Sequence, residues 1–174
     1  FEFYNPRDLE HLESLIKDNT SVIYLESPGT YTFEIIDIQE VVKICKRYNL
    51  KSIIDNTWAT ALYFNPLEFG VDIVIEAITK YISGHSDIMM GAVVGNDDNL
   101  IALERWTKNS GTYVSPDDVY LSLRGLRTLP LRLKQSSENS FAIAEFLENK
   151  DEVKRVIHPA LSQHSDHKIW KRDF

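Results

Sequence analysis

The sequence predicts an α/β fold with a mostly parallel sheet whose strands are joined by helical crossovers. Continuous runs rich in β-branched residues at 52–54 and 71–75 indicate strands buried on both faces, and 22–25 reads as a further short buried strand. Between them, apolar side chains recur at i, i+3, i+4 and i+7 in the segment 38–45, which is typical of an amphipathic helix. This alternation of strand and helix favours parallel pairing over hairpins.

The remaining elements of the first half follow from caps and turn residues. Residues 8–17 are predicted as a helix with one leucine-rich face. The strand at 22–25 is closed by Ser27-Pro28-Gly29, a strong turn signal. Asp37 is placed to cap the amphipathic helix that follows it. Pro66 to Phe69 should form a short helical turn between the two β-branched strands.

The second half predicts one more strand and three helical features. Ile88 to Val94 should be a strand, after which residues 96–99 turn the chain into a helix over about 100–108. Ser115-Pro116, followed by two acidic residues, is a strong helix start. Pro130 opens a long helix to about residue 148, with a stripe of small and apolar side chains suited to close packing.

Composition restricts the class of protein. The chain has 174 residues and 43% hydrophobic content, enough for one domain or slightly more. Its net charge of −7, with Lys and Arg scattered, argues against a nucleic-acid or anionic-membrane surface, so the expected partner is a small molecule. The single cysteine cannot form an internal disulfide, and no apolar stretch approaches the roughly 20 residues that span a bilayer. We therefore expect a soluble, cytoplasmic protein.

Two charged residues follow neighbouring predicted strands. Asp55 ends the strand at 52–54, and Lys80 comes shortly after the strand at 71–75. In parallel sheets, ligands bind at this edge. A pyridoxal-phosphate site needs both groups, because a lysine forms the internal imine with the aldehyde and an acid keeps the ring nitrogen protonated. Thr79 can offer its hydroxyl to the phosphate, so these three residues are the predicted cofactor site, with Lys80 catalytic.

Simpler interpretations exist for each candidate. Lys80 alone would read as a surface lysine, and Asp55 could cap a helix; their context favours the cofactor roles. We expect His85 to order the loop after Lys80 rather than to act in catalysis. Cys45 lies on an apolar helix face and is predicted to be core. His164, with a second histidine three residues later, more simply belongs to a solvated tail than to a metal site, so no metal is predicted.

Five motifs make the chain resemble the Cys/Met-metabolism family of pyridoxal-phosphate enzymes along nearly its whole length. These are Glu26-Ser27-Pro28, Asp55-Asn56-Thr57, Thr79-Lys80-Tyr81, Gly84-His85-Ser86-Asp87 and Arg124-Gly125-Leu126-Arg127-Thr128. Within the family, the stretch 26–34, Trp58 and the tail 170–174 are most similar to the bacterial cystathionine β-lyases.

The resemblance implies part of the large domain of a fold-type I enzyme, incomplete at both ends. Residues 1–128 would belong to the cofactor-binding domain. Residues 129–174 would be the connecting helix and the start of a C-terminal domain, with 153–157 as its first strand. The family's cofactor-stacking tyrosine, phosphate-binding loop and substrate-binding arginine would lie outside the chain. We therefore expect negligible activity from this chain alone and a homo-oligomer, a tetramer, for the full-length parent.

The activity implied by resemblance is β-elimination of cystathionine to homocysteine, pyruvate and ammonia, in the transsulfuration route of methionine biosynthesis. Cystathionine γ-synthase or γ-lyase activity, or a non-catalytic remnant, stays open. A dinucleotide-binding domain is disfavoured because no glycine-rich turn follows the first strand. Ala77 stands where many members have a serine, and Thr30-Tyr31 where many have Asn-Pro, which leaves the contact to the cofactor ring hydroxyl unassigned.

Overall fold

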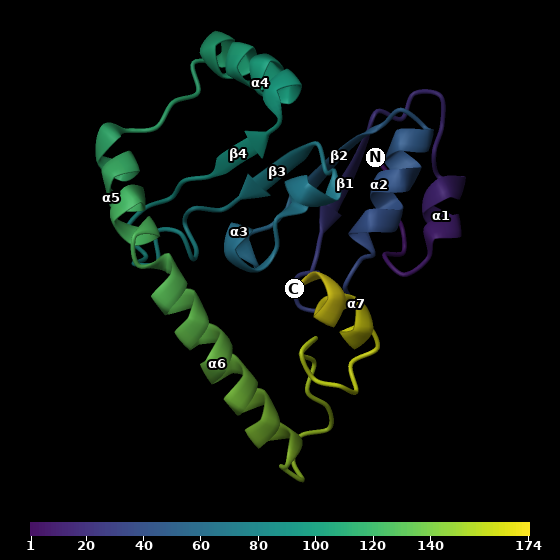
Figure 1. The fold of residues 1–174 in the computed structure, drawn as a ribbon, viewed down its shortest axis with the longest axis vertical. Helices are drawn as coiled ribbons and strands as arrows, with labels where there is room; N and C mark the ends of the chain where they lie inside the picture. Colours follow the sequence, from purple (N-terminus) through teal and green to yellow (C-terminus); the bar gives the residue numbers. More distant parts are fainter.

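A four-stranded sheet forms the centre of the protein (Figure 1). The computed structural model describes residues 1–174, apart from the side chain of residue 97. The strands lie side by side in chain order: β1 (Val22–Glu26), β2 (Lys51–Asp55), β3 (Ile73–Glu76) and β4 (Ala92–Gly95). The first three are parallel and β4 runs antiparallel to β3. The mostly parallel α/β sheet predicted from the sequence is confirmed.

Helices occupy most of the remaining chain. They are α1 (Leu9–Ser14), α2 (Ile38–Arg47), α3 (Thr60–Tyr63), the 3₁₀ helix η1 (Pro66–Phe69), α4 (Asp97–Ser110), α5 (Pro116–Leu126), α6 (Leu129–Glu148) and α7 (His167–Asp173). The side chains of Asp37, Asn96 and Ser115 cap α2, α4 and α5 by accepting backbone N–H bonds. The run 96–99 is thus the cap and first turn of α4 rather than a turn before it. None of the helices in the described part of the chain is long and apolar enough to cross a membrane.

The main core lies between α2 and one face of the sheet. Leu25 of β1, Ile54 of β2 and Val74 of β3 are paired neighbours in the register, and all three are buried against this helix. The opposite face is less covered: Val22 is 44% exposed and Tyr24 is 52% exposed. In β2 and β3, the strands predicted to be buried on both faces, the isoleucines on this second face are half-buried: Ile53, Ile73 and Ile75. An uninterrupted apolar run contains no polar residue that would mark its more exposed face.

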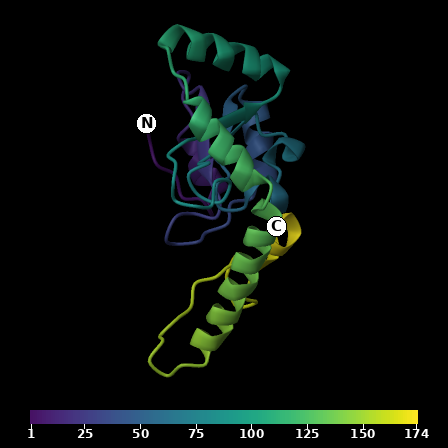
Figure 2. The same ribbon diagram turned by 90° about the vertical axis from the view of Figure 1, so that its left-hand side faces the viewer.

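Helices α5 and α6 form a long ridge beside the sheet, and α6 extends well beyond it (Figures 1 and 2). Leu133 and Ala144 of α6 are buried, whereas Ser137 and Ser140 between them are exposed. The small-residue stripe predicted along this helix is therefore buried only in part.

The segment after α6 returns to the sheet and ends beside it (Figure 1). Residues 153–157, predicted as a strand, have no strand structure. A strand needs a neighbour to complete its hydrogen bonds, and within the described residues none pairs with them. Instead the tail is held by two ion pairs, Arg7 to Asp166 at 2.7 Å and Arg172 to Asp37 at 3.0 Å.

Asp166 is the buried anchor of this tail. Its carboxylate also accepts a hydrogen bond from the Ile35 N–H at 3.0 Å. Burial would raise the pKa of Asp166, but the hydrogen bonds from Arg7 and Ile35 outweigh it and hold the pKa below its ordinary value. Ionised Asp166 thus stabilises the fold above its unfolded pKa of about 3.9, and this contribution is lost as the pH falls through the folded pKa.

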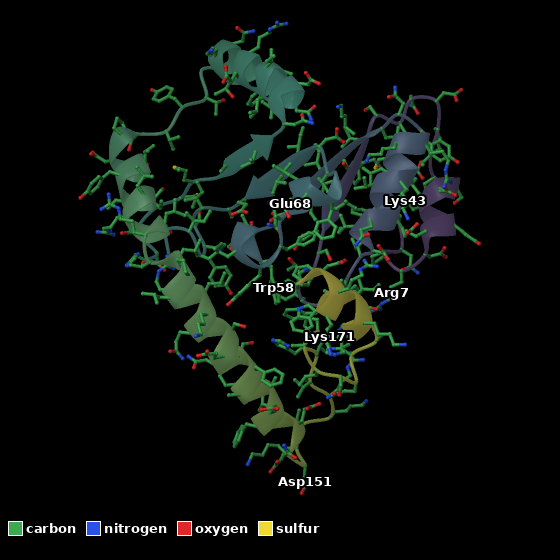
Figure 3. The ribbon with its side chains drawn as sticks, viewed as in Figure 1. Arg7, Lys43, Trp58, Glu68, Asp151 and Lys171 are labelled. Carbon is green, nitrogen blue, oxygen red and sulfur yellow. The ribbon has the colours of Figure 1, made fainter. Side chains whose placement is uncertain are left out.

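We predict that Asp166→Ala lowers the free energy of unfolding near neutral pH by about 2–3 kcal/mol, because it removes charge-assisted hydrogen bonds from a buried site. Urea denaturation followed by circular dichroism would measure the change. Asp151→Ala is the control, because Asp151 is exposed and lies just after α6, at the end of the molecule farthest from the sheet (Figure 3). Its free energy of unfolding should change little. The difference between Asp166→Ala and the unmodified chain should shrink below about pH 3.9. Equal stability of the two substituted chains at neutral pH would contradict this anchoring role.

Candidate functional site

A cavity of about 1240 Å³ opens beside the carboxyl ends of the parallel strands. Glu26 ends β1 and Asp55 ends β2, and both line it. Thr79 and Lys80, from the turn after β3, line it as well. The structure thus brings the three residues predicted from the sequence, Asp55, Thr79 and Lys80, to one cavity. This is the edge at which parallel α/β sheets bind ligands.

Lys80 is presented by a tight turn. Its N–H donates to the Ala77 carbonyl at 3.0 Å, and its own carbonyl accepts from the Gly84 N–H at 2.9 Å. The side chain is exposed. Among the described residues, no hydrogen bond or ion pair engages its Nζ. The amine is therefore free to react with a ligand in the cavity.

Asp55 is fixed by the strand register and by one local hydrogen bond. Its Oδ1 accepts from the Thr57 N–H at 2.9 Å. No partner among the described residues bonds to Oδ2, so this oxygen is available to a ligand. The carboxylates of Asp55 and Glu26 act on Tyr24: burial raises the pKa of this phenol, and the two negative charges raise it further.

Glu76, which ends β3, does not reach the cavity. Asp55 pairs with Ile75 in the register, so Glu76 projects from the opposite face, where it is buried. Burial raises the pKa of Glu76, although a hydrogen bond from Asn56 at 3.4 Å opposes the shift. The strand register therefore assigns the ligand-facing position to Asp55.

The hydroxyl of Thr79 is already bonded to the main chain. It donates to the Met90 carbonyl at 3.1 Å and accepts from the Met90 N–H at 2.9 Å. Donation to a phosphate would require the hydroxyl to give up the Met90 carbonyl. What the structure does show is that Thr79 connects the turn before Lys80 to the segment leading into β4.

Three further cavity residues had no role assigned to them from the sequence. Thr57 accepts a hydrogen bond from the Ala77 N–H at 2.8 Å, which connects the segments that follow β2 and β3. Trp58 lines the cavity and also packs edge-on against Phe174 near α7, with ring centroids 6.0 Å apart (Figure 3). Arg132 comes from α6. Arg132 comes 52 residues after Lys80 in the chain, so no motif around the lysine indicates that the two lie near one cavity.

The other candidates lie outside the cavity. His85 Nδ1 lies 2.6 Å from the Ser83 carbonyl, which fits a role in ordering the loop. Cys45 is in the core, where burial, with a smaller effect of Asp72, raises the pKa of its thiol to about 11. This pKa leaves almost no nucleophilic thiolate at neutral pH. His164 bonds to the Asp166 N–H, and the described residues contain no cluster suited to a metal ion.

Comparison with known proteins identifies the family. A model of the Cys/Met metabolism PLP-dependent enzymes matches residues 1–174. The chain therefore belongs to this family, whose members depend on pyridoxal phosphate.

The relatives carry several activities. A Rhizobium johnstonii protein provisionally named cystathionine beta-lyase is 45% identical over 99% of this chain and 44% of its own length. The L-alanine/L-glutamate racemase of Wolbachia pipientis is 41% identical over 99% of this chain and 42% of its own length. A crystal structure of cystathionine gamma-lyase from Lactobacillus plantarum in complex with L-serine superposes with a TM-score of 0.95 at 33% identity. It is matched over 99% of this chain and 46% of its own. The chain thus spans less than half the length of these relatives.

The cavity fits the cofactor of this family. A pyridoxal-phosphate site needs an amine that is free to bond and an acid that can pair with the ring nitrogen. Lys80 would supply the first and the Oδ2 atom of Asp55 the second. The volume of about 1240 Å³ exceeds the 300–1,000 Å³ or so of an ordinary small-molecule site.

Proposed function

We propose that the chain carries the cofactor site of a carbon–sulfur lyase that cleaves cystathionine by β-elimination to homocysteine, pyruvate and ammonia. The observation that carries this proposal is the meeting of an unpaired lysine and a strand-end aspartate in one cavity. Family membership supports the cofactor, and the name of the Rhizobium relative supports the reaction.

Each residue would have a defined role. When bound, pyridoxal phosphate supplies an electron sink for the carbanion at substrate Cα. Lys80 would hold the cofactor covalently through Nζ and, once displaced by the substrate amine, would take the proton from Cα as general base. Asp55 would accept a hydrogen bond from the ring nitrogen and keep it protonated. Trp58, which lines the same cavity, would exclude water from the reacting atoms.

The names of the relatives do not distinguish the reactions, because relatives of similar identity carry β-lyase and racemase names and the superposed structure is a γ-lyase. We favour β-elimination because the stretch 26–34 and Trp58 resemble the bacterial cystathionine β-lyases. Product analysis with cystathionine separates the reactions, since β-elimination releases pyruvate and γ-elimination releases 2-oxobutyrate. A homotetramer and a cytoplasmic location stay predictions.

We predict that borohydride reduction of the enzyme encoded by the complete reading frame, loaded with pyridoxal phosphate, fixes the cofactor to the peptide that contains Lys80. Mass spectrometry of the digest would locate the label. Lys80→Arg should abolish labelling, whereas Lys51→Arg, on a lysine paired with Asp72 outside the cavity, should leave it unchanged. A label on another lysine, or none, would overturn the assignment.

We also predict that Asp55→Asn lowers turnover roughly a thousandfold while circular dichroism shows an unchanged fold. An ion pair at about 4 Å is worth about 4 kcal/mol near a protein surface, and a neutral amide cannot keep the ring nitrogen protonated. Asp151→Asn, at an exposed position, is the matched control. Turnover of the Asp55 variant within tenfold of the control would show that another acid pairs with the ring.

A further inference from the structure

Two motifs that are far apart in the sequence form a single contact beside Lys80. The loop 84–87 follows the lysine turn, and the segment 124–128 comprises the end of α5 and the two residues that join it to α6. Arg124 pairs with Asp87 at 2.7 Å and attaches α5 to this loop. Figure 1 shows the junction of the two helices beside the loops that follow β3. The lysine turn is thus held from outside the sheet.

Arg132 lies at the centre of this contact. Its guanidinium donates to the Tyr81 carbonyl at 2.7 Å, the Ile82 carbonyl at 3.2 Å and the Gly125 carbonyl at 2.8 Å. A fourth bond, from Nε, reaches the Thr128 hydroxyl at 3.0 Å. An arginine side chain has five N–H donors in a fixed planar fork. Four bonds therefore use most of this capacity, and three of them are to main-chain carbonyls.

Two glycines make room for this arrangement. Gly84 has a φ of 70°, and a Cβ there would overlap the Arg132 guanidinium. A Cβ on Gly125 would overlap the carbonyl oxygens of Ile82 and Ser83. The glycines of both motifs are thus required by the close approach of Arg132 and α5 to the lysine turn.

The contacts of Arg132 argue for positioning rather than ligand binding. It lines the cavity, which could suggest that it binds an anionic substrate group. Its donors, however, are directed at the backbone on the C-terminal side of Lys80. Among the described residues, Arg132 is the only hydrogen-bond partner of the Tyr81 and Ile82 carbonyls.

We propose that Arg132 is a positioning residue for Lys80: by binding the carbonyls of Tyr81 and Ile82, it fixes the turn that directs Lys80 Nζ into the cavity. The inference rests on the proposed role of Lys80 in holding pyridoxal phosphate. It assigns to α6 a part in the cofactor site that is independent of contact with the cofactor.

The test uses the enzyme from the complete reading frame with Arg132→Lys and Arg132→Ala. Lysine keeps the charge but presents a point donor rather than a planar fork, so it cannot bind three separated carbonyls. Arg127→Lys is the matched control, because Arg127 is exposed in the same motif. Three quantities are measured: the fraction of Lys80 labelled by borohydride, the pH midpoint of the visible absorbance of the cofactor-linked lysine, and kcat against KM.

Both Arg132 variants should label Lys80 less completely and shift the pH midpoint. They should also lose about tenfold to a hundredfold in kcat, since misplacement by about 1 Å costs about a hundredfold. KM should change less. Guanidinium ion, well below denaturing concentrations, should partly restore labelling in Arg132→Ala, whereas methylammonium at equal ionic strength should not. If Arg132 only stabilised the fold, added guanidinium would lower the labelling of Arg132→Ala further, because guanidinium weakens folded proteins.

The possible failures are distinguishable. If the unmodified enzyme carries no label on Lys80, the proposed function is wrong and the positioning role is wrong with it. If it is labelled and the Arg132 variants match Arg127→Lys in labelling and pH midpoint, the positioning role alone is overturned. Should the Arg132 variants fail to fold, Thr128→Val, which removes the acceptor of Arg132 Nε together with the hydroxyl's own bond to the Gly125 carbonyl, must still shift the pH midpoint relative to Arg127→Lys. An unshifted midpoint in that variant would also overturn the proposal.

Discussion

The parallel register of β1, β2 and β3 is the constraint on which the rest of the molecule depends. It aligns Leu25, Ile54 and Val74 in one row beneath α2. Because successive strand residues face opposite sides, the burial of Ile54 forces Asp55 onto the other face, at the end of its strand. A slip of one residue would exchange the two and bury the carboxylate in the core. Core packing therefore decides where the acid of the site lies.

The sheet alone does not place the lysine. Lys80 lies four residues beyond the end of β3, outside the hydrogen-bonded ladder. Its position depends on side-chain to main-chain bonds: Thr79 to Met90 on one side of it and Arg132 to Tyr81 and Ile82 on the other. These bonds are short and directional, so the turn can be rigid without a hydrophobic core of its own. The candidate site thus combines an acid positioned by core packing with a lysine on a turn that polar contacts hold.

The sequence predicted those features that leave a local trace. Strand ends followed by Asp55 and by Thr79-Lys80 stand out because a charged residue directly after an apolar run is unusual. Helix caps such as Ser115 are equally local. The antiparallel direction of β4 leaves no such trace, nor do the contacts of Arg132, which depend on two segments meeting in space. The strand expected at 153–157 was inferred from resemblance, and in this chain it has no pairing partner among the described residues.

The central claim is that one cavity joins Lys80 and Asp55 around a single cofactor. A crystal structure of the enzyme from the complete reading frame, grown with pyridoxal phosphate, tests it most directly. The account predicts continuous electron density from Lys80 Nζ to the cofactor, with an Asp55 carboxylate oxygen at hydrogen-bond distance from the ring nitrogen. Arg132 should still bind the Tyr81 and Ile82 carbonyls. Cofactor density bonded to another lysine, or a ring nitrogen that faces a different acid, would contradict the account.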